Sequence, residues 1–245
     1  MRNPRIHVDQ RLGVGDEFAL PEGPARHVAQ VLRMRVGDAL TLFNGDGNDY
    51  GGELLDVTRR DARVRIDTCN VVEKESSLRI TLLQGISKGE RMDWVMQKSV
   101  ELGVHAIVPV VTERTVVRID DSRSDKKLAH WQGVVISACE QSGRAVIPEV
   151  REPIRFAEAI AQFKGAVLDP LASISLTAGR PEAAQSPLAA SLLIGPEGGL
   201  SDVEIDQAKQ AGWVGARLGP RVLRTETAAL AALAVMQASW GDLAN

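Results

Sequence analysis

Residues suited to chemistry are concentrated at three junctions, each of which follows a short apolar segment of the sequence. Residues 195–199 read Gly-Pro-Glu-Gly-Gly, residues 219–227 read Gly-Pro-Arg-Val-Leu-Arg-Thr-Glu-Thr, and Asp169 and Pro170 form the third junction. Glycine lets backbone N–H and C=O groups approach a ligand closely, while carboxylate and guanidinium groups can accept protons or balance charge. Together the junctions predict a ligand site, although each one alone could be no more than a turn.

Strands of a parallel sheet must position these junctions. Residues 166–168, 191–194 and 214–218 are short apolar segments typical of buried strands, and they end where the junctions begin. From about residue 78, strand and helix patterns alternate, which predicts an α/β domain with a parallel sheet. Ligands of such sheets bind beyond the carboxyl ends of the strands. Other strands are expected at 78–83 and 106–111. Two helices are expected to begin after capping boxes, one formed by Ser87 and Glu90 and the other by Ser201 and Glu204. Further helices are expected at 126–141, 156–163 and 225–240, and a surface loop is expected at 172–187.

The first 70 residues follow a different pattern. Strand-like segments at 39–44, 50–57 and 63–68 are separated by turn residues, and only residues 24–32 favour a helix. Several short strands with frequent turns predict a small β-barrel. The chain is therefore expected to contain two domains, at residues 1–70 and 71–245.

Composition and missing motifs exclude several classes of protein. The 245 residues contain no P-loop motif, and the glycines near residue 47 lie in a hairpin rather than in a dinucleotide-binding turn. Four scattered histidines and two distant cysteines do not have the spacing of a metal site, so no metal is expected. The N-terminus is not a signal peptide and no apolar run would span a membrane, which predicts a cytoplasmic protein without a membrane partner.

A formal net charge of −3 does not favour a nucleic-acid partner. The distribution of charge matters more than its total, however, and arginines gather in the first 35 residues. Solvated surface side chains are the alternative interpretation. The RNA-binding candidates are Arg2, Arg5, Arg26, His27 and Arg33.

The two C-terminal junctions carry motifs that resemble those of the SPOUT methyltransferases, in the variant of the 16S ribosomal RNA uracil-N3 methyltransferase family. The first motif is Ile-Gly-Pro-Glu-Gly-Gly-Leu-Ser at 194–201, and the second is Leu-Gly-Pro-Arg-Val-Leu-Arg-Thr-Glu-Thr-Ala at 218–228. Three further blocks occur in the family's order: Val-Leu-Arg at 31–33 after His27, Lys-Gly-Glu-Arg at 88–91, and Glu-Gln-Ser-Gly-Arg at 140–144. The resemblance covers nearly the whole chain, although Arg26 stands where the family often has a second histidine.

The resemblance implies a PUA-like RNA-binding barrel followed by a SPOUT methyltransferase domain with a deep trefoil knot, where the residues alone would predict an unknotted doubly wound fold. It also implies that the protein uses S-adenosylmethionine to methylate N3 of a specific uridine in 16S ribosomal RNA, either naked or in the small ribosomal subunit. The cofactor would contact Leu168, Asp169, Ile194, Gly195, Pro196, Gly198, Gly199, Leu218, Gly219, Leu223, Arg224 and Thr225.

Methyl transfer to uracil N3 requires that the N3 proton leave. A carboxylate could accept the proton, and arginines could stabilise charge on the flanking carbonyl groups. The candidates for the first role are Glu197 and Glu226, and those for the second are Arg91, Arg144 and Arg224. Each glutamate could instead form a structural hydrogen bond to the backbone.

The closing helix at 225–240 is rich in alanine and carries more apolar surface than one sheet face would cover. With the family resemblance, this predicts a two-fold homodimer through this helix and residues 91–102, with Ala232 at the interface. Burial within one chain is the alternative. Two other functions also stay open: a methyltransferase of the same fold that acts on tRNA, and a non-catalytic RNA-binding or ribosome-assembly protein without affinity for S-adenosylmethionine.

Overall fold

The computed structural model describes residues 3–116, 121–178 and 188–244. The chain divides into two compact units. The first unit contains Met1–Glu75 with Cys139–Ile147, and the second contains Ser76–Ala138 with Pro148–Asn245. A short segment from the middle of the sequence thus belongs to the first unit. The division into domains at 1–70 and 71–245 stays a prediction.

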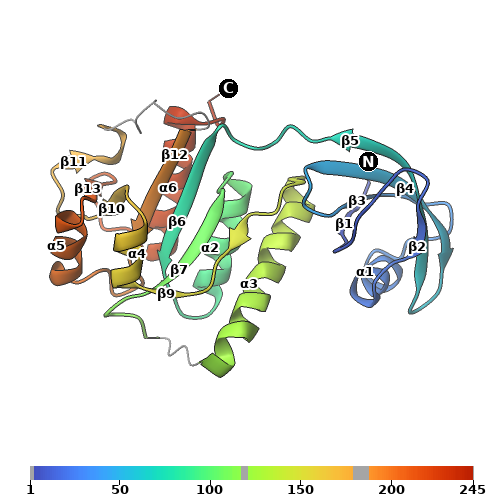
Figure 1. Cartoon of the computed structure of the whole chain (residues 1–245), viewed down its shortest axis with the longest axis horizontal. Coiled ribbons are helices and arrows are strands. Elements are labelled where there is room, and N and C mark those ends of the chain that lie inside the picture. The colour runs from blue at the N-terminus through green and yellow to red at the C-terminus, as the bar shows by residue number, and fades with distance from the viewer. Residues whose placement is uncertain (1–2, 117–120, 179–187, 245) are drawn as a thin grey trace. The chain divides into compact units, whose positions relative to one another are not determined.

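The first unit is a mixed five-stranded sheet with one short helical segment (Figure 1). Its strands lie in the order β1-β3-β4-β5-β2, and only β1 and β3 pair in parallel. Alternating side chains such as Leu40, Leu42 and Leu54 are fully buried in its core. The strands are β1 (Arg5–His7), β2 (Glu17–Ala19), β3 (Ala39–Phe43), β4 (Asn48–Val57) and β5 (Ala62–Val71), and helix α1 (Glu22–Arg26) continues into a π-helical turn, His27–Val31.

Two buried arginines hold the segment 139–147 within the first unit. The Arg5 guanidinium donates to the Asp49 carboxylate at 2.6 Å and to the carbonyl oxygen of Arg144 at 3.0 Å. The Arg144 side chain in turn donates to the Glu75 carboxylate at 3.0 Å. Because both guanidinium groups are buried with ionic partners, each one stabilises the fold only while its carboxylate is present.

The second unit confirms the predicted parallel α/β architecture. The eight strands among its described residues all pair in parallel, in the order β11-β13-β10-β12-β6-β7-β8, and β9 pairs with β7. The trefoil knot implied by the family resemblance stays a prediction. The strands are β6 (Leu78–Gly85), β7 (Ala106–Val111), β8 (Glu149–Val150), β9 (Ile154–Arg155), β10 (Ala166–Leu168), β11 (Ile174–Ser175), β12 (Leu188–Ile194) and β13 (Val214–Arg217).

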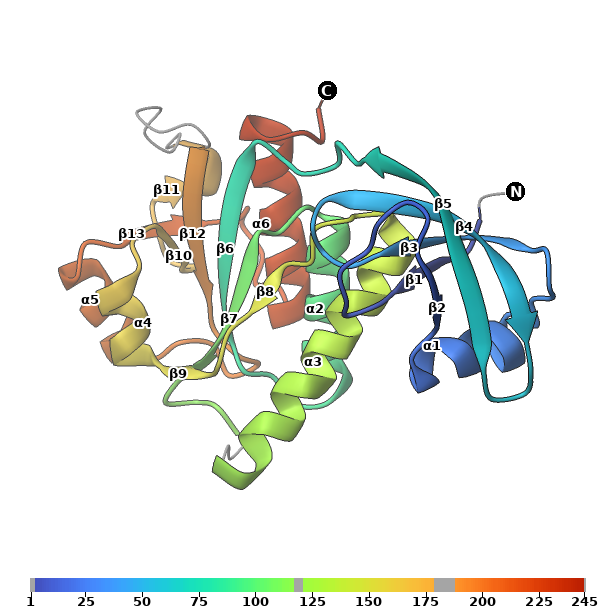
Figure 2. The same cartoon turned by 45° about the vertical axis from the view of Figure 1, so that its right-hand side comes forward.

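Helices cover both faces of this sheet. Figures 1 and 2 show α2 (Glu90–Glu101) and α6 (Thr225–Trp240) behind β12, β6 and β7, with α4 (Phe156–Gln162) in front. Side chains of α4 and α5 (Asp202–Gln210) share one buried cluster with β6, β7, β10 and β12. Helix α3 spans Asp121–Ser142. None of the helices in the described parts of the chain is both long and apolar enough to cross a membrane.

The structure confirms one predicted helix start and corrects another. Ser201 caps α5 as expected, because its hydroxyl accepts the Glu204 N–H and the Glu204 carboxylate accepts the Ser201 N–H. The capping box predicted for Ser87 and Glu90 is wrong. Helix α2 begins at Glu90 after Gly89, which has no side chain to cap it, and the Ser87 hydroxyl instead donates to the Gly85 carbonyl.

The surface loop predicted at 172–187 is only partly a loop. It contains strand β11, which extends the sheet beside β13, and a turn of 3-10 helix at Leu176–Ala178. Residues 179–187 lie outside the described parts of the chain.

Candidate functional site

A cavity of about 240 Å³ lies in the second unit where β10, β12 and β13 end. The three junctions selected from the sequence form its walls, as expected for the carboxyl edge of a parallel sheet. Of the predicted cofactor residues, Arg224 alone is absent from the lining. The others all line it: Leu168, Asp169, Ile194, Gly195, Pro196, Gly198, Gly199, Leu218, Gly219, Leu223 and Thr225.

Two glycines shape this cavity for different reasons. A Cβ atom on Gly195 would lie 2.6 Å from the Leu200 nitrogen and 2.7 Å from the Gly199 carbonyl carbon, so only glycine lets the loop fold back on itself here. A Cβ atom on Gly219 would meet nothing within 4 Å, but its φ of 74° is a left-handed conformation that other residues adopt at a cost. Glycine is therefore required at position 195 by close packing and is favoured at position 219 by the backbone conformation.

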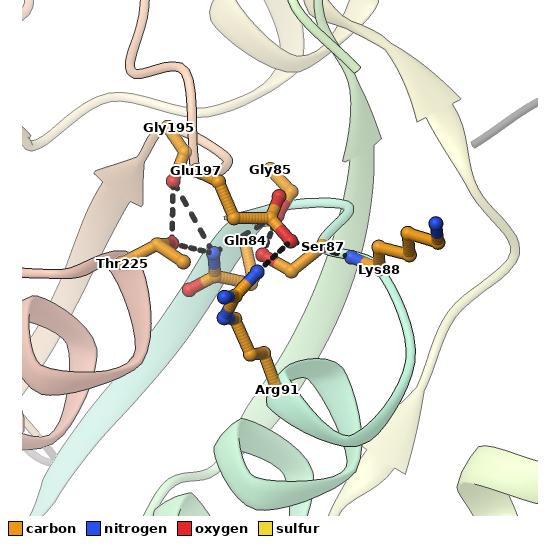
Figure 3. Close-up of polar contacts among 8 residues, drawn as sticks. All are labelled: Gln84, Gly85, Ser87, Lys88, Arg91, Gly195, Glu197 and Thr225. Atoms are coloured by element: carbon orange, nitrogen blue, oxygen red, sulfur yellow. Dashed lines mark hydrogen bonds and ion pairs between the residues drawn. The ribbon is translucent and has the colours of Figure 1, made fainter. Parts of the chain in front are cut away.

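A buried glutamine ties the floor of the cavity together (Figure 3). The Gln84 amide nitrogen, from β6, donates to the Thr225 hydroxyl at 2.9 Å and to the Gly85 carbonyl at 2.9 Å. The Thr225 hydroxyl donates to the Gly195 carbonyl at 2.6 Å. The amide oxygen of Gln84, Oε1, is buried and has no hydrogen-bond partner among the described residues. The position of the Gly195 loop therefore depends on a chain of hydrogen bonds from β6 through the first turn of α6.

Replacing Thr225 by valine tests this chain of hydrogen bonds. Thr225→Val keeps the side-chain shape but leaves the Gly195 carbonyl without its hydroxyl donor, so we expect the free energy of unfolding to fall by about 1–3 kcal/mol. Thr225→Ser keeps the hydroxyl and is the matched control. Chemical denaturation of both variants measures the difference. Equal stability of the valine and serine variants would contradict the assigned role.

A carboxylate clamp joins the Gly195–Gly199 loop to the start of α2. Glu197 Oε1 accepts the Lys88 backbone N–H at 2.8 Å and a guanidinium N–H of Arg91 at 3.1 Å (Figure 3). Burial alone would raise the pKa of Glu197, but hydrogen bonds from the backbone N–H groups of Lys88 and Glu197 and from Arg91 outweigh it and lower the pKa. Glu197 is thus held as an anion, which makes it a weak proton acceptor.

The loop after β7 supports the other side of the same wall. Arg114 donates to the Gly198 carbonyl at 2.8 Å. Next to it, the Glu113 backbone N–H donates to Glu204 at 2.8 Å, and the Glu113 carboxylate accepts the Ser201 hydroxyl at 2.7 Å. Neither Glu113 nor Arg114 was predicted from the sequence. Their position directly after a predicted strand was the available signal, because the carboxyl ends of parallel strands share one edge.

Asp169 lies in the cavity wall with both carboxylate oxygens engaged. Oδ1 accepts the Leu171 N–H at 2.9 Å, and Oδ2 accepts the ammonium group of Lys209 at 3.0 Å. The negative charge of Asp169 in the cavity wall is therefore balanced by Lys209 of α5.

The remaining catalytic candidates do not share one location. Arg224 is exposed at the residue before α6, and Arg91 belongs to the clamp. Arg144 lies in the first unit with Glu75 and does not line the cavity. Glu226 does not line the cavity either, and its Oε2 is buried without a hydrogen bond among the described residues.

The RNA-binding candidates in the first unit also separate. Arg26 and Arg33 are exposed and His27 is half-buried. Arg5 is 7% exposed and bound to Asp49, so the structure places it in the interior rather than on a basic surface. Arg2 lies outside the described residues.

Comparisons with known proteins agree on one family. The family model described as "RNA methyltransferase domain" matches residues 74–237, and the one described as "RNA methyltransferase PUA domain" matches residues 20–67. The chain is 35% identical to ribosomal RNA small subunit methyltransferase E of Buchnera aphidicola, over 99% of this chain and 98% of the relative.

Solved structures agree over the same length. A Legionella pneumophila protein crystallised with bound cofactor SAM superposes with a TM-score of 0.95 at 43% identity, over 99% of this chain and 100% of the other. Ribosomal RNA small subunit methyltransferase E of Neisseria gonorrhoeae, bound to S-adenosyl methionine, gives a TM-score of 0.91 at 41% identity, with the same coverage. By its sequence motifs, its fold and these matches, the chain belongs to the RNA methyltransferase family that includes ribosomal RNA small subunit methyltransferase E.

Proposed function

We propose that this chain is a cytoplasmic enzyme that uses S-adenosylmethionine to methylate N3 of a uridine in small-subunit ribosomal RNA. The observation that carries the proposal is the convergence of three strand-end loops around one cavity. These loops have the motifs of a family in which two full-length structural relatives were crystallised with this cofactor.

The lining of the cavity suits the cofactor. Leu168, Ile194 and Leu218 offer apolar contacts for a flat heterocycle, and the glycine loops bring backbone donors and acceptors to its polar groups. When bound, S-adenosylmethionine supplies a methyl group on a positively charged sulfur.

The role of the protein in methyl transfer is to position the base and to stabilise the charge left when the imide proton departs. Arg91 and Arg224 are the candidates for stabilising that charge, since both have exposed guanidinium groups on elements that border the cavity loops. Glu197 serves in this proposal as the clamp of the loop rather than as the base. Binding of the RNA is assigned to the first unit, which contains the segment matched by the PUA model.

The decisive experiment maps modified uridines in RNA from a strain that lacks the protein. We expect one N3-methyluridine to disappear from small-subunit ribosomal RNA and to return when the wild-type gene is restored. Disappearance of a tRNA modification instead would support the tRNA alternative. Unchanged RNA, together with no affinity for S-adenosylmethionine in calorimetry, would support the non-catalytic alternative.

The proposal includes a homodimer through α2 and the outer side of α6. Ala232 does not belong to that interface, because its side chain is fully buried within a single chain. The better candidate is Trp94 on α2, which is 57% exposed in the single chain. Large aromatic side chains of this kind are typical anchors of protein interfaces.

Replacing Trp94 by aspartate tests the dimer. A charge at the interface should weaken dimerisation by about 30-fold or more, corresponding to a loss of about 2 kcal/mol. Sedimentation of the wild-type protein and the Trp94→Asp variant at micromolar concentration measures the change in dimerisation. Val203→Asp is the control, because Val203 is an exposed apolar residue on α5. A wild-type chain that is monomeric and fully active would contradict the dimer.

A further inference from the structure

We infer that the first unit binds unpaired RNA through residues 26–36 and the turn at Arg59 and Arg60. The arginines of this surface would bind phosphates, and its aliphatic side chains would contact bases. The inference rests on the proposed function, because it names the surface by which the RNA substrate is held. Three independent observations carry it: a strained arginine, exposed aliphatic side chains and a hollow bordered by arginines.

The strained residue is Arg33. Its φ of 54° makes it the only residue other than glycine with a positive φ among the described residues. It follows the π-helical turn, which ends with hydrogen bonds from the Leu32 N–H to the His27 carbonyl at 2.9 Å and from the Met34 N–H to the Val28 carbonyl at 3.0 Å. Glycine is the usual residue where a helix ends in this conformation. An arginine in this strained conformation therefore points to a function of its exposed side chain.

Aliphatic side chains surround the strained residue and face solvent. Val31 is 68% exposed, Val36 is 60% exposed, and Leu32 is also exposed. Between them, Met34 is buried in the core, so this segment is anchored to the unit while its neighbours remain free for contact. Exposed apolar groups beside cations suit a ligand that offers both flat apolar faces and negative charge.

The third observation is a surface hollow in the same unit, lined by Glu22, Arg26, Gln30, Arg59, Arg60 and Asp61. Gln30, in the π-helical turn, donates to the Arg59 carbonyl at 3.0 Å and so ties the two basic segments together. With Arg33 and Arg35, this region has five arginines against the carboxylates of Glu22, Asp38 and Asp61. The excess of positive charge is local, since the whole chain is acidic.

RNA with unpaired bases fits this combination better than a duplex does. In a duplex the base faces are stacked and hidden, and the groove presents mainly phosphates and hydroxyl groups. Unpaired bases expose apolar faces that Val31 and Val36 can contact, while the phosphates between them are within the reach of long arginine side chains. The RNA methyltransferase PUA model covers residues 20–67 and so includes the whole surface.

The first test replaces Arg33 by glycine in the full-length protein. Glycine removes the charge and relieves the strained backbone, so we expect a higher thermal unfolding midpoint together with about tenfold weaker RNA binding. The slope of log affinity against log salt should fall by about 0.7, as for one lost phosphate contact to a single strand. Arg33→Lys keeps the charge and the strain, and should bind RNA as the wild-type protein does.

The second test removes the aliphatic contacts. Val31→Ser combined with Val36→Ser should weaken RNA binding by about tenfold without changing the salt dependence, because no charge is lost. Val71→Ser is the control, since Val71, on β5 of the same unit, is also exposed, at 77%. The probes are transcribed small-subunit ribosomal RNA and small ribosomal subunits from a strain that lacks the protein.

The outcomes separate this inference from the proposed function. If the wild-type protein binds RNA, and the Arg33→Gly variant and the double serine variant bind it equally well, the inference is overturned but the proposed function is not. An Arg33→Gly protein that unfolds at a lower temperature than the wild type would likewise overturn the inference alone. A wild-type protein that binds neither probe, yet binds S-adenosylmethionine, would overturn the ribosomal substrate and the inference with it.

Discussion

Gly195→Ala is expected to abolish measurable binding of S-adenosylmethionine, with a loss of at least about 100-fold in affinity, or about 2.7 kcal/mol. The new methyl group would lie 2.6 Å from the Leu200 nitrogen, where no real side chain fits, so the loop must open. Because the Gly195 carbonyl also accepts the Thr225 hydroxyl, opening the loop would disturb the floor of the cavity as well as its wall. Calorimetric titration measures the affinity directly.

Gly133→Ala is the matched control for this prediction. A Cβ atom on Gly133 meets nothing within 4 Å, and the residue lies within helix α3, where alanine is the better helix former. We therefore expect unchanged cofactor affinity and equal or greater stability. Circular dichroism of both variants establishes that they are folded, and wild-type affinity of a folded Gly195→Ala protein would exclude this loop from the site.

The second large effect is expected at Glu197, where two substitutions should differ. Glu197→Ala removes the acceptor for Lys88 and Arg91, and should lower kcat by about 100-fold through loss of positioning. Glu197→Gln keeps an oxygen acceptor and should lose less than about tenfold. If Glu197 were instead the proton acceptor, both substitutions would remove it, and each would cost a similar factor of about 100–10,000.

The pH dependence gives an independent check on Glu197. The pKa of Glu197 is lowered, because its hydrogen bonds outweigh the effect of burial. The carboxylate therefore stays charged at every pH above the ordinary pKa of a glutamate. The stabilisation from the clamp is therefore fully present at neutral pH and is lost only as the pH falls through the lowered pKa. Activity between pH 6 and 9 should show no step that Glu197→Gln removes. A step that disappears in this variant would favour the role of base.

The location of the cavity could be predicted from the sequence because the sequence signals for it are local. Short apolar strands that end in glycine junctions are visible without tertiary information, and the rule that ligands bind at the carboxyl edge of a parallel sheet brings them together. The residues of the Gly195 and Gly219 junctions line one cavity for that reason. The capping box at Ser201 was predictable on the same grounds, since its partner Glu204 is only three residues away.

The errors concern residues whose partners lie far along the chain. At the start of α2 the backbone N–H of Lys88 is bound by Glu197, so no local capping box forms at Ser87. Arg5 resembles a surface arginine until Asp49 and the Arg144 carbonyl are placed beside it. Ala232 is buried within its own chain, and an alanine pattern does not distinguish this from burial at an interface.

The contacts that build the cavity also determine when it can form. The bonds from Gln84 to Thr225, from Lys88 to Glu197 and from Arg114 to Gly198 span 141, 109 and 84 residues. Such a high contact order makes folding slow, because long loops must close before the contacts that stabilise them exist. A nascent chain consequently has no complete cavity until α6 has left the ribosome. Only chains in which the start of α6 has joined the sheet can then gain stability from the methyl donor.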